Sequence, residues 1–165
     1  MSKRFVIAAL LVALVLVAGC SKPKEGPGSD AWRTQTRAYV AVYAKANRAA
    51  VESLNKQSEA LRSGSAITSD QAGHLMTGAS EDLAKAMKDL EAVKPPAELV
   101  EVHAAELAFL KSAKDGVEKQ AAGVQAGDTA AIAEGQTLLQ QAQEAQNKAQ
   151  TQLRAFMTKY NDQLK

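Results

Sequence analysis

The residues best suited to chemistry in this sequence are His103 and Glu106, which form the pattern H-x-x-E. Residues three apart on a helix lie on one face, so an imidazole and a carboxylate at this spacing can reach the same ion. Leu99 and Leu107, one turn to either side, place His103 on the apolar stripe of its helix. The pair is therefore a candidate metal site, although two ligands alone leave such a site incomplete.

Two families of helical proteins share parts of this pattern. The motif resembles the G-x-H-x-x-E of imelysin-like periplasmic proteins linked to iron uptake, with Glu101 at the glycine position and a much shorter chain. A histidine facing a bundle interior also resembles the haem ligand of b562-type cytochromes, but the order of residues differs from that family. We expect no cofactor and a structural His103 that is hydrogen-bonded to a polar side chain such as Gln146. The methionines available to a haem on other helices are Met76, Met87 and Met157.

Other titratable residues lack the arrangements of known catalytic sites. The sequence has no G-x-S-x-G elbow and no close set of nucleophile, base and orienting residue. His74 lies two residues from the apolar positions Ala72 and Met76, so we expect it on the surface. The adjacent Glu81 and Asp82 favour a helix N-terminus. We therefore predict that the chain is not an enzyme.

The N-terminus has the composition of a secretory signal peptide. Lys3 and Arg4 precede an uncharged run from Phe5 to Gly19. As a helix this run spans about 22 Å at ~1.5 Å per residue, less than the ~30 Å hydrocarbon core of a membrane. A basic start, a short apolar run and small residues at its end predict a signal peptide over residues 1–19.

The residues Leu16-Val17-Ala18-Gly19-Cys20 resemble the lipobox of bacterial lipoproteins. The resemblance implies cleavage between Gly19 and Cys20 by signal peptidase II, and a diacylglyceryl group with palmitate-type chains on the Cys20 thiol. Each buried methylene contributes about 0.8 kcal/mol, so two or three chains anchor a protein that does not span the membrane. Ser21 favours the outer membrane, on its periplasmic or surface face, if the host is Gram-negative.

Cys20 is also the only cysteine of the chain. Once it is lipidated, no thiol remains for a disulfide or a thiolate metal site. The chain has 20 basic and 18 acidic residues. Removal of Lys3 and Arg4 with the signal peptide leaves a formally neutral protein, and this neutrality predicts no binding to nucleic acid.

Residues 30–165 have the three–four spacing of apolar residues that is typical of helices. Before them, residues 20–29 are rich in proline and glycine and form a flexible linker that reaches at most about 30 Å. Asp30 is the predicted N-cap of the first helix, and Thr68 and Gln71 form a capping box at the second. Pro95 and Pro96 mark the boundary between the second and third helices, and Gly127 followed by Asp128 marks the boundary between the third and fourth. The predicted helices are approximately 30–63, 68–93, 96–126 and 128–164.

Connections of a few residues make consecutive helices antiparallel. We therefore predict an all-α fold, an antiparallel up-down-up-down four-helix bundle with coiled-coil-like packing, preceded by the signal peptide and flexible linker. The segments PPAELVEVHAAELAFL and QAGDTAAIAEGQTLLQQA resemble small exported bacterial bundle proteins of unknown function. That resemblance implies the same fold and no particular activity.

These features predict a membrane-anchored envelope lipoprotein that acts as a non-enzymatic interaction or structural module. Its partners are the lipid bilayer, through acylated Cys20, and an envelope protein bound by polar helix faces such as QQAQEAQNKAQTQ. The alternative is a metal- or haem-binding envelope protein that uses His103 with Glu106. The sequence indicates no oligomeric state.

Overall fold

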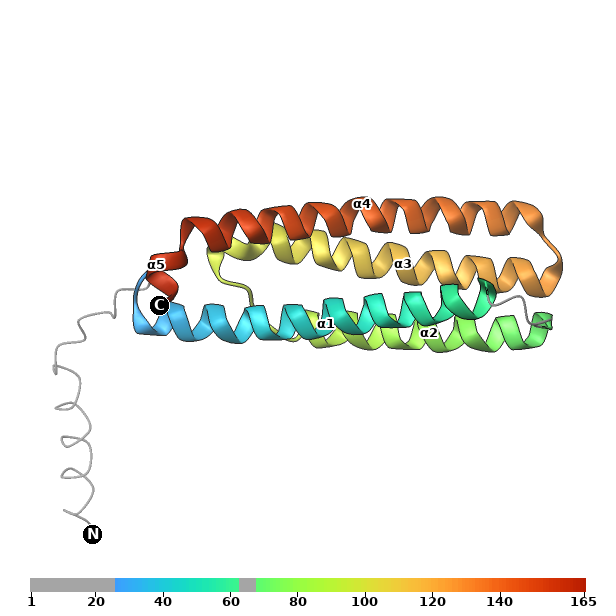
Figure 1. The fold of residues 1–165 in the computed structure, drawn as a ribbon, viewed down its shortest axis with the longest axis horizontal. Helices are drawn as coiled ribbons and strands as arrows, with labels where there is room; N and C mark the ends of the chain where they lie inside the picture. Colours follow the sequence, from blue (N-terminus) through green and yellow to red (C-terminus); the bar gives the residue numbers. More distant parts are fainter. Residues whose placement is uncertain (1–25, 63–67) are drawn as a thin grey trace, which may run out of the picture.

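The computed structural model describes residues 26–62 and 68–165, and within them the chain is all-helical, as predicted, with no strand. Four long helices lie side by side along one axis (Figure 1). None of the described helices is long and apolar enough to cross a membrane. The elements are α1 (Asp30–Arg62), α2 (Ser69–Glu91), the 3₁₀ turn η1 (Ala97–Leu99), α3 (Val100–Ala126), α4 (Thr129–Lys159) and the short α5 (Asn161–Leu164).

Polar caps set the starts of the first two helices. Ser29 Oγ accepts a hydrogen bond from the Trp32 amide at 3.2 Å, so Ser29 caps α1. The prediction that Asp30 is the cap was wrong by one residue, and Asp30 instead lies in the first helical turn. The predicted capping box of α2 is confirmed, because Thr68 Oγ1 accepts from the Gln71 amide and Gln71 Oε1 accepts from the Thr68 amide.

The junction between α3 and α4 also follows local signals in the sequence. Gly127 ends α3 with φ +65°, in the left-handed region that favours glycine. The next residue, Asp128, caps α4 by accepting at Oδ1 from the amides of Ala130 and Ala131. This compact stop and start makes the connection between the two helices very short.

Two predicted helices are divided differently in the structure. The predicted helix 96–126 begins with the 3₁₀ turn η1 before the regular α3. The predicted helix 128–164 is interrupted at Tyr160, whose φ of −111° and ψ of 15° lie outside the α-helical region, so that α5 follows as a separate turn. By contrast, α2 runs without interruption through Gly78 and Ser80.

The core lies between the apolar faces of the four long helices. The three–four spacing of the third predicted helix includes Val100 as an inward residue, but the structure leaves Val100 52 % exposed, whereas Val102 is 2 % exposed. Because η1 has the tighter winding of a 3₁₀ turn, the stripe counted along α3 does not continue through its first residue. The largest side chains of the hydrophobic core with less than 2 % exposure are Tyr39, Phe109, Leu83, Leu90, Leu99, Leu110 and Val117.

Neighbouring helices along the chain pack against each other, α1 on α2, α2 on α3 and α3 on α4. The approach of α3 and α4 is close because Gly116 and Gly135 face each other; a Cβ atom on Gly135 would lie 2.7 Å from the Gly116 carbonyl oxygen. α1 and α4 meet near the C-terminus, where the Trp32 and Tyr160 rings lie 5.5 Å apart. Along the rest of their length α1 and α4 approach each other less closely than consecutive long helices do.

Candidate functional site

A cluster of polar side chains lies buried between α1 and α3. Tyr39, Tyr43 and Asn47 follow one face of α1 at intervals of four residues, and they face Glu106 and His103 of α3. Glu106 is 0 % exposed, and its Oε1 accepts a hydrogen bond from Asn47 Nδ2 at 2.9 Å. The Tyr39 and His103 ring centroids lie 5.8 Å apart. We call these five residues the α1–α3 polar cluster.

Burial shifts the ionisation of this cluster. It raises the pKa of the Glu106 carboxyl, while the hydrogen bond from Asn47 and the nearby Tyr43 hydroxyl lower that pKa in part. Burial also raises the pKa of the Tyr39 and Tyr43 phenols, and the charge of Glu106 raises it further. Both phenols are therefore neutral at any physiological pH, and they surround a carboxyl whose charged form is disfavoured.

Several atoms of this region have no hydrogen-bond partner among the described residues. Tyr43 Oη lies near Glu106 but its geometry falls short of a hydrogen bond, so Glu106 Oε2 is left unpaired. A buried polar atom without a partner costs about 1–3 kcal/mol. These atoms are therefore well suited to take up a further partner. The full set is Thr36 Oγ1, Tyr39 Oη, Tyr43 Oη, His103 Nδ1 and Glu106 Oε2.

Different groups act on His103 and Glu106, the predicted metal ligands. Burial lowers the pKa of the half-buried His103 imidazole, and the negative charge of Glu91 partly offsets this effect by raising the pKa. Glu106 interacts instead with side chains of α1. Within residues 26–62 and 68–165, no group of three or more His, Cys, Asp or Glu side chains could hold a metal ion. Metal binding by His103 and Glu106 stays a prediction.

The predicted hydrogen bond between His103 and Gln146 was wrong. Gln146 is buried on α4, but its Oε1 accepts from Gln143 Nε2 at 3.2 Å, one turn away on the same helix. His103 Nδ1 has no partner within the described part of the chain. Its ring packs on α1 instead, against Tyr39. Helical periodicity placed His103 on an inward face without showing which helix it faces.

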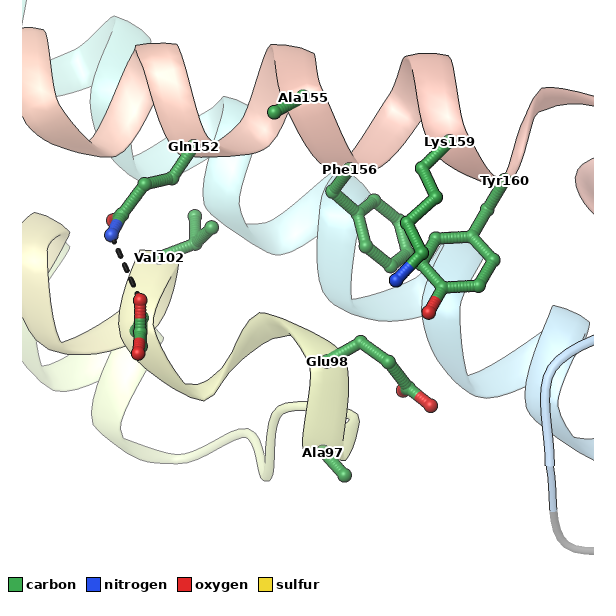
Figure 2. Close-up of a pocket in the computed structure, with 9 residues that line it drawn as sticks. Ala97, Glu98, Val102, Gln152, Ala155, Phe156, Lys159 and Tyr160 are labelled. Atoms are coloured by element: carbon green, nitrogen blue, oxygen red, sulfur yellow. Dashed lines mark hydrogen bonds between the residues drawn. The ribbon is translucent and has the colours of Figure 1, made fainter.

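A groove of about 400 Å³ opens between the start of α3 and the last turns of α4 (Figure 2). Its aromatic side is formed by Phe156 and Tyr160, whose ring centroids lie 4.9 Å apart. Lys159 Nζ lies 5.0 Å from the centroid of the Tyr160 ring, close enough for a cation–π contact. We call this the linker-side groove, because the chain enters α1 at the same end of the molecule (Figure 1).

The carboxylates of the linker-side groove are both bound within the protein. Glu98 Oε2 accepts a hydrogen bond from Trp32 Nε1 at 3.1 Å. Glu101 Oε2 accepts from Gln152 Nε2 at 3.1 Å, the bond dashed in Figure 2. The first bond connects η1 to α1 and the second connects α3 to α4, so both stabilise this end of the bundle. Among the charged side chains that line the groove, Lys159 is the one without a hydrogen bond to a described residue.

Sequence reasoning missed the polar side chains that α1 contributes to the α1–α3 polar cluster. Tyr39 and Tyr43 belong to the three–four spacing of the first predicted helix and were expected only to face the core, and Asn47 was not singled out. The four-residue spacing of these three side chains is a signal that a row of polar atoms enters the core along α1. Glu106 was expected to face a metal ion beside His103, and the structure places it against this row instead.

The predicted lipidation residue Cys20 and cleavage residue Gly19 lie outside the described residues, so lipidation stays a prediction. His74 is exposed, as predicted. Comparisons with family models, with curated proteins and with solved structures found no match to the chain.

Proposed function

We propose that this chain is a lipid-anchored protein of the bacterial envelope whose helical domain is a non-enzymatic interaction or structural module. The observation that carries the proposal is the sequence Leu16–Cys20, placed directly after a basic start and a short apolar run. Signal peptidase II cuts between Gly19 and Cys20, and acyl chains on Cys20 enter the bilayer. In a Gram-negative host the outer membrane is the favoured location, because Ser21 follows the cysteine.

The proposed architecture of this module is an up-down-up-down four-helix bundle. Support comes from the packing of each long helix on the next one along the chain and from the short connections between them. Residues 20–29 then form the tether, which holds the bundle within about 30 Å of the membrane surface. A rigid body on a short tether can present its helix faces to other envelope components.

The lipid anchor is tested by feeding an alkyne-labelled fatty acid to a bacterial host that expresses the full chain. We expect label on the wild-type protein and recovery with membranes, and no label on Cys20→Ser. Ser21→Ala, next to the modified residue, is the matched control and should keep the label. Equal labelling of Cys20→Ser and wild type would overturn the proposal.

The second candidate function is binding of a metal or haem by His103, with Glu106 as a further ligand of a metal. The observation in its favour is that His103 Nδ1 and Glu106 Oε2 are buried and unpaired among the described residues. An imidazole nitrogen and a carboxylate oxygen are both common ligands of transition metals. Neither group belongs to a set of three candidate ligands in the described ranges.

This candidate predicts a Soret band, or one tightly held metal ion per chain, in the protein purified from cells. His103→Ala should abolish the signal, and His74→Ala, on the exposed side of α2, should leave it unchanged. A colourless protein with less than stoichiometric iron, copper and zinc by elemental analysis would contradict it.

A further inference from the structure

A second groove lies beside η1, between the first turns of α1 and the loop that joins α2 to η1. It has a volume of about 620 Å³, and we call it the proline groove because Pro95 and Pro96 line it. Ala97 and Glu98 of η1 line both this groove and the linker-side groove. The two grooves therefore lie together at the end of the bundle where the chain enters α1 (Figure 1).

Apolar side chains are exposed at this end of the bundle. Val100, which lines the proline groove, is 52 % exposed, and Met157 in the last turn of α4 is 41 % exposed. The third exposed large apolar side chain among the described residues, Leu75, lies towards the other end, in the first half of α2. The apolar surface open to a partner is thus greatest where the chain enters α1.

The charged side chains of the two grooves differ in how far they can reach. Glu98 and Glu101 are each held by a hydrogen bond from another helix. Lys94 of the proline groove and Lys159 of the linker-side groove are exposed, and neither forms an ion pair with a described residue. A lysine ammonium on its flexible stem can extend to a negative surface, whereas these two carboxylates stay close to the protein.

We call Lys94, Pro95, Ala97, Val100 and Lys159 the linker-end face. The proposed tether, residues 20–29, ends beside it, since Ala31 of α1 lines the proline groove. A bilayer that holds Cys20 would therefore always lie within about 30 Å of this face. A short tether gives an effective concentration in the millimolar range, so a contact with a dissociation constant of about 1 mM is about half formed.

The size of the linker-end face also bears on its partner. Its apolar part consists of one valine, one proline and one alanine, far less than the 1,200–2,000 Å² that a stable protein interface typically buries. A weak contact of this kind is effective when the partner is already held nearby. The membrane is such a partner, and the two lysines match its anionic headgroups.

We propose that the linker-end face docks on the surface of a membrane that contains anionic phospholipids. Val100 and Pro95 enter the headgroup region, and Lys94 and Lys159 bind lipid phosphates on either side of η1. Docking at one end stands the bundle on the membrane. The sides of the four long helices then remain accessible to other envelope components.

This inference deepens the proposed function and rests on the lipid anchor, so the test supplies the anchor by other means. The chain from residue 20, which contains every described helix, carries Cys20→Ser and a histidine tag before residue 20. The tag binds nickel-chelating lipid in vesicles of phosphatidylcholine and phosphatidylglycerol. Lipid labelling of the full chain tests Cys20 separately, so failure of one experiment leaves the result of the other intact.

Docking is read from an environment-sensitive nitrobenzoxadiazole fluorophore on a single introduced cysteine, since Cys20→Ser leaves no other. Ala97→Cys places it on the linker-end face, and Ala126→Cys, also exposed, places it at the far end of α3. We expect at least a twofold rise in emission with a shift to shorter wavelength at position 97, and no change at position 126. Vesicles of phosphatidylcholine with the chelating lipid alone should give a much smaller response.

Two changes in the face test its chemistry, with the fluorophore at position 97. Val100→Ser should reduce the response at least twofold, and Lys94→Gln/Lys159→Gln should remove the preference for phosphatidylglycerol. Arg48→Gln/Lys56→Gln is the matched control, because it removes the same charge from exposed positions of α1 outside the face. It should respond as the unsubstituted protein does, and unchanged thermal unfolding will show that all variants are folded.

Three outcomes would overturn the proposal. The first is the absence of a response at position 97 on phosphatidylglycerol vesicles. The second is an equal response at positions 97 and 126, or equal losses in the two double variants. The third is a photocrosslink from position 97, in cells, to a second copy of the chain or to another protein without a response on vesicles, which would assign the face to that protein.

Discussion

Glu106 lies fully buried between α1 and α3, with Asn47 donating to one of its carboxyl oxygens. Burial raises the pKa of this carboxyl above the ordinary value of 4.5, because the charged form loses its hydration. The folded state therefore keeps the proton to a higher pH than the unfolded chain does. The stability that this group contributes is complete below about pH 4.5, and it is lost as the pH rises through the pKa of the folded state.

Glu106→Gln should make the protein more stable at pH 8 and leave it little changed at pH 4. Glutamine keeps an acceptor for Asn47 and gains a donor towards Tyr43, but it cannot ionise. We expect a gain of about 1–3 kcal/mol in the free energy of unfolding at pH 8, measured by urea denaturation. Glu144→Gln, exposed on α4, is the control and should show no such difference. A Glu106→Gln variant that is less stable than wild type at pH 8 would contradict this account.

At the scale of the elements, the contact between α3 and α4 depends on the absence of side chains at two glycines. A Cβ atom on Gly135 would lie 2.7 Å from the Gly116 carbonyl oxygen and 2.9 Å from the Gln120 backbone nitrogen. Both are backbone atoms, which cannot move aside without separating the helices. Gly135→Ala should therefore lower the free energy of unfolding by about 1–3 kcal/mol, as measured by urea denaturation.

Gly78→Ala separates this packing effect from helix propensity. Gly78 also lies inside a helix, but a Cβ atom there would meet nothing within 4 Å. The alanine should stabilise α2 by about 0.5–1 kcal/mol, because glycine has the higher conformational entropy in the unfolded chain. If Gly135→Ala proved as stabilising as Gly78→Ala, the close approach of α3 and α4 would be refuted.

The helices could be predicted from the sequence because their signals are local. The Thr68 capping box and the Gly127-Asp128 junction each depend on residues within one turn, and the structure confirms both. The error at Asp30 was of one residue, because Ser29 beside it is an equally good cap. These signals say where a helix begins and ends, and they carry no information about its neighbours.

The polar regions depend on contacts between distant parts of the chain, and this is why the sequence did not predict them. Glu106 meets Asn47 across 59 positions of the sequence. The groove that Gln57 of α1 and Gln136 of α4 both line needs these two residues on facing helices. Periodicity shows that His103 faces inward, but only the packing of α3 on α1 shows that it lies against Tyr39 rather than Gln146.

At the scale of the whole molecule, the two ends of the helical domain are joined. Arg33 Nε donates to the Gln163 carbonyl oxygen at 2.7 Å, and Arg37 Nη2 donates to that of Leu164 at 2.5 Å. The last four carbonyls of a helix have no partner within the helix, and a cation at that end also interacts favourably with the helix dipole. The two arginines of α1 therefore hold α5 in place and close one end of the seam between α1 and α4.

The double variant Arg33→Ala/Arg37→Ala should free α5 while leaving the bundle folded. Both arginines are on the surface, so the free energy of unfolding should fall by less than about 1 kcal/mol. Local opening of α5 should need much less free energy once these bonds are lost, because α5 has only a few other contacts. We expect faster hydrogen exchange in α5 and the first turns of α1, measured by mass spectrometry, and unchanged exchange in α2 and α3. Arg48→Ala, exposed farther along α1, should change neither; exchange in α5 that stays as slow as in the wild type would show that the aromatic contact of Trp32 with Tyr160 is sufficient to hold this end.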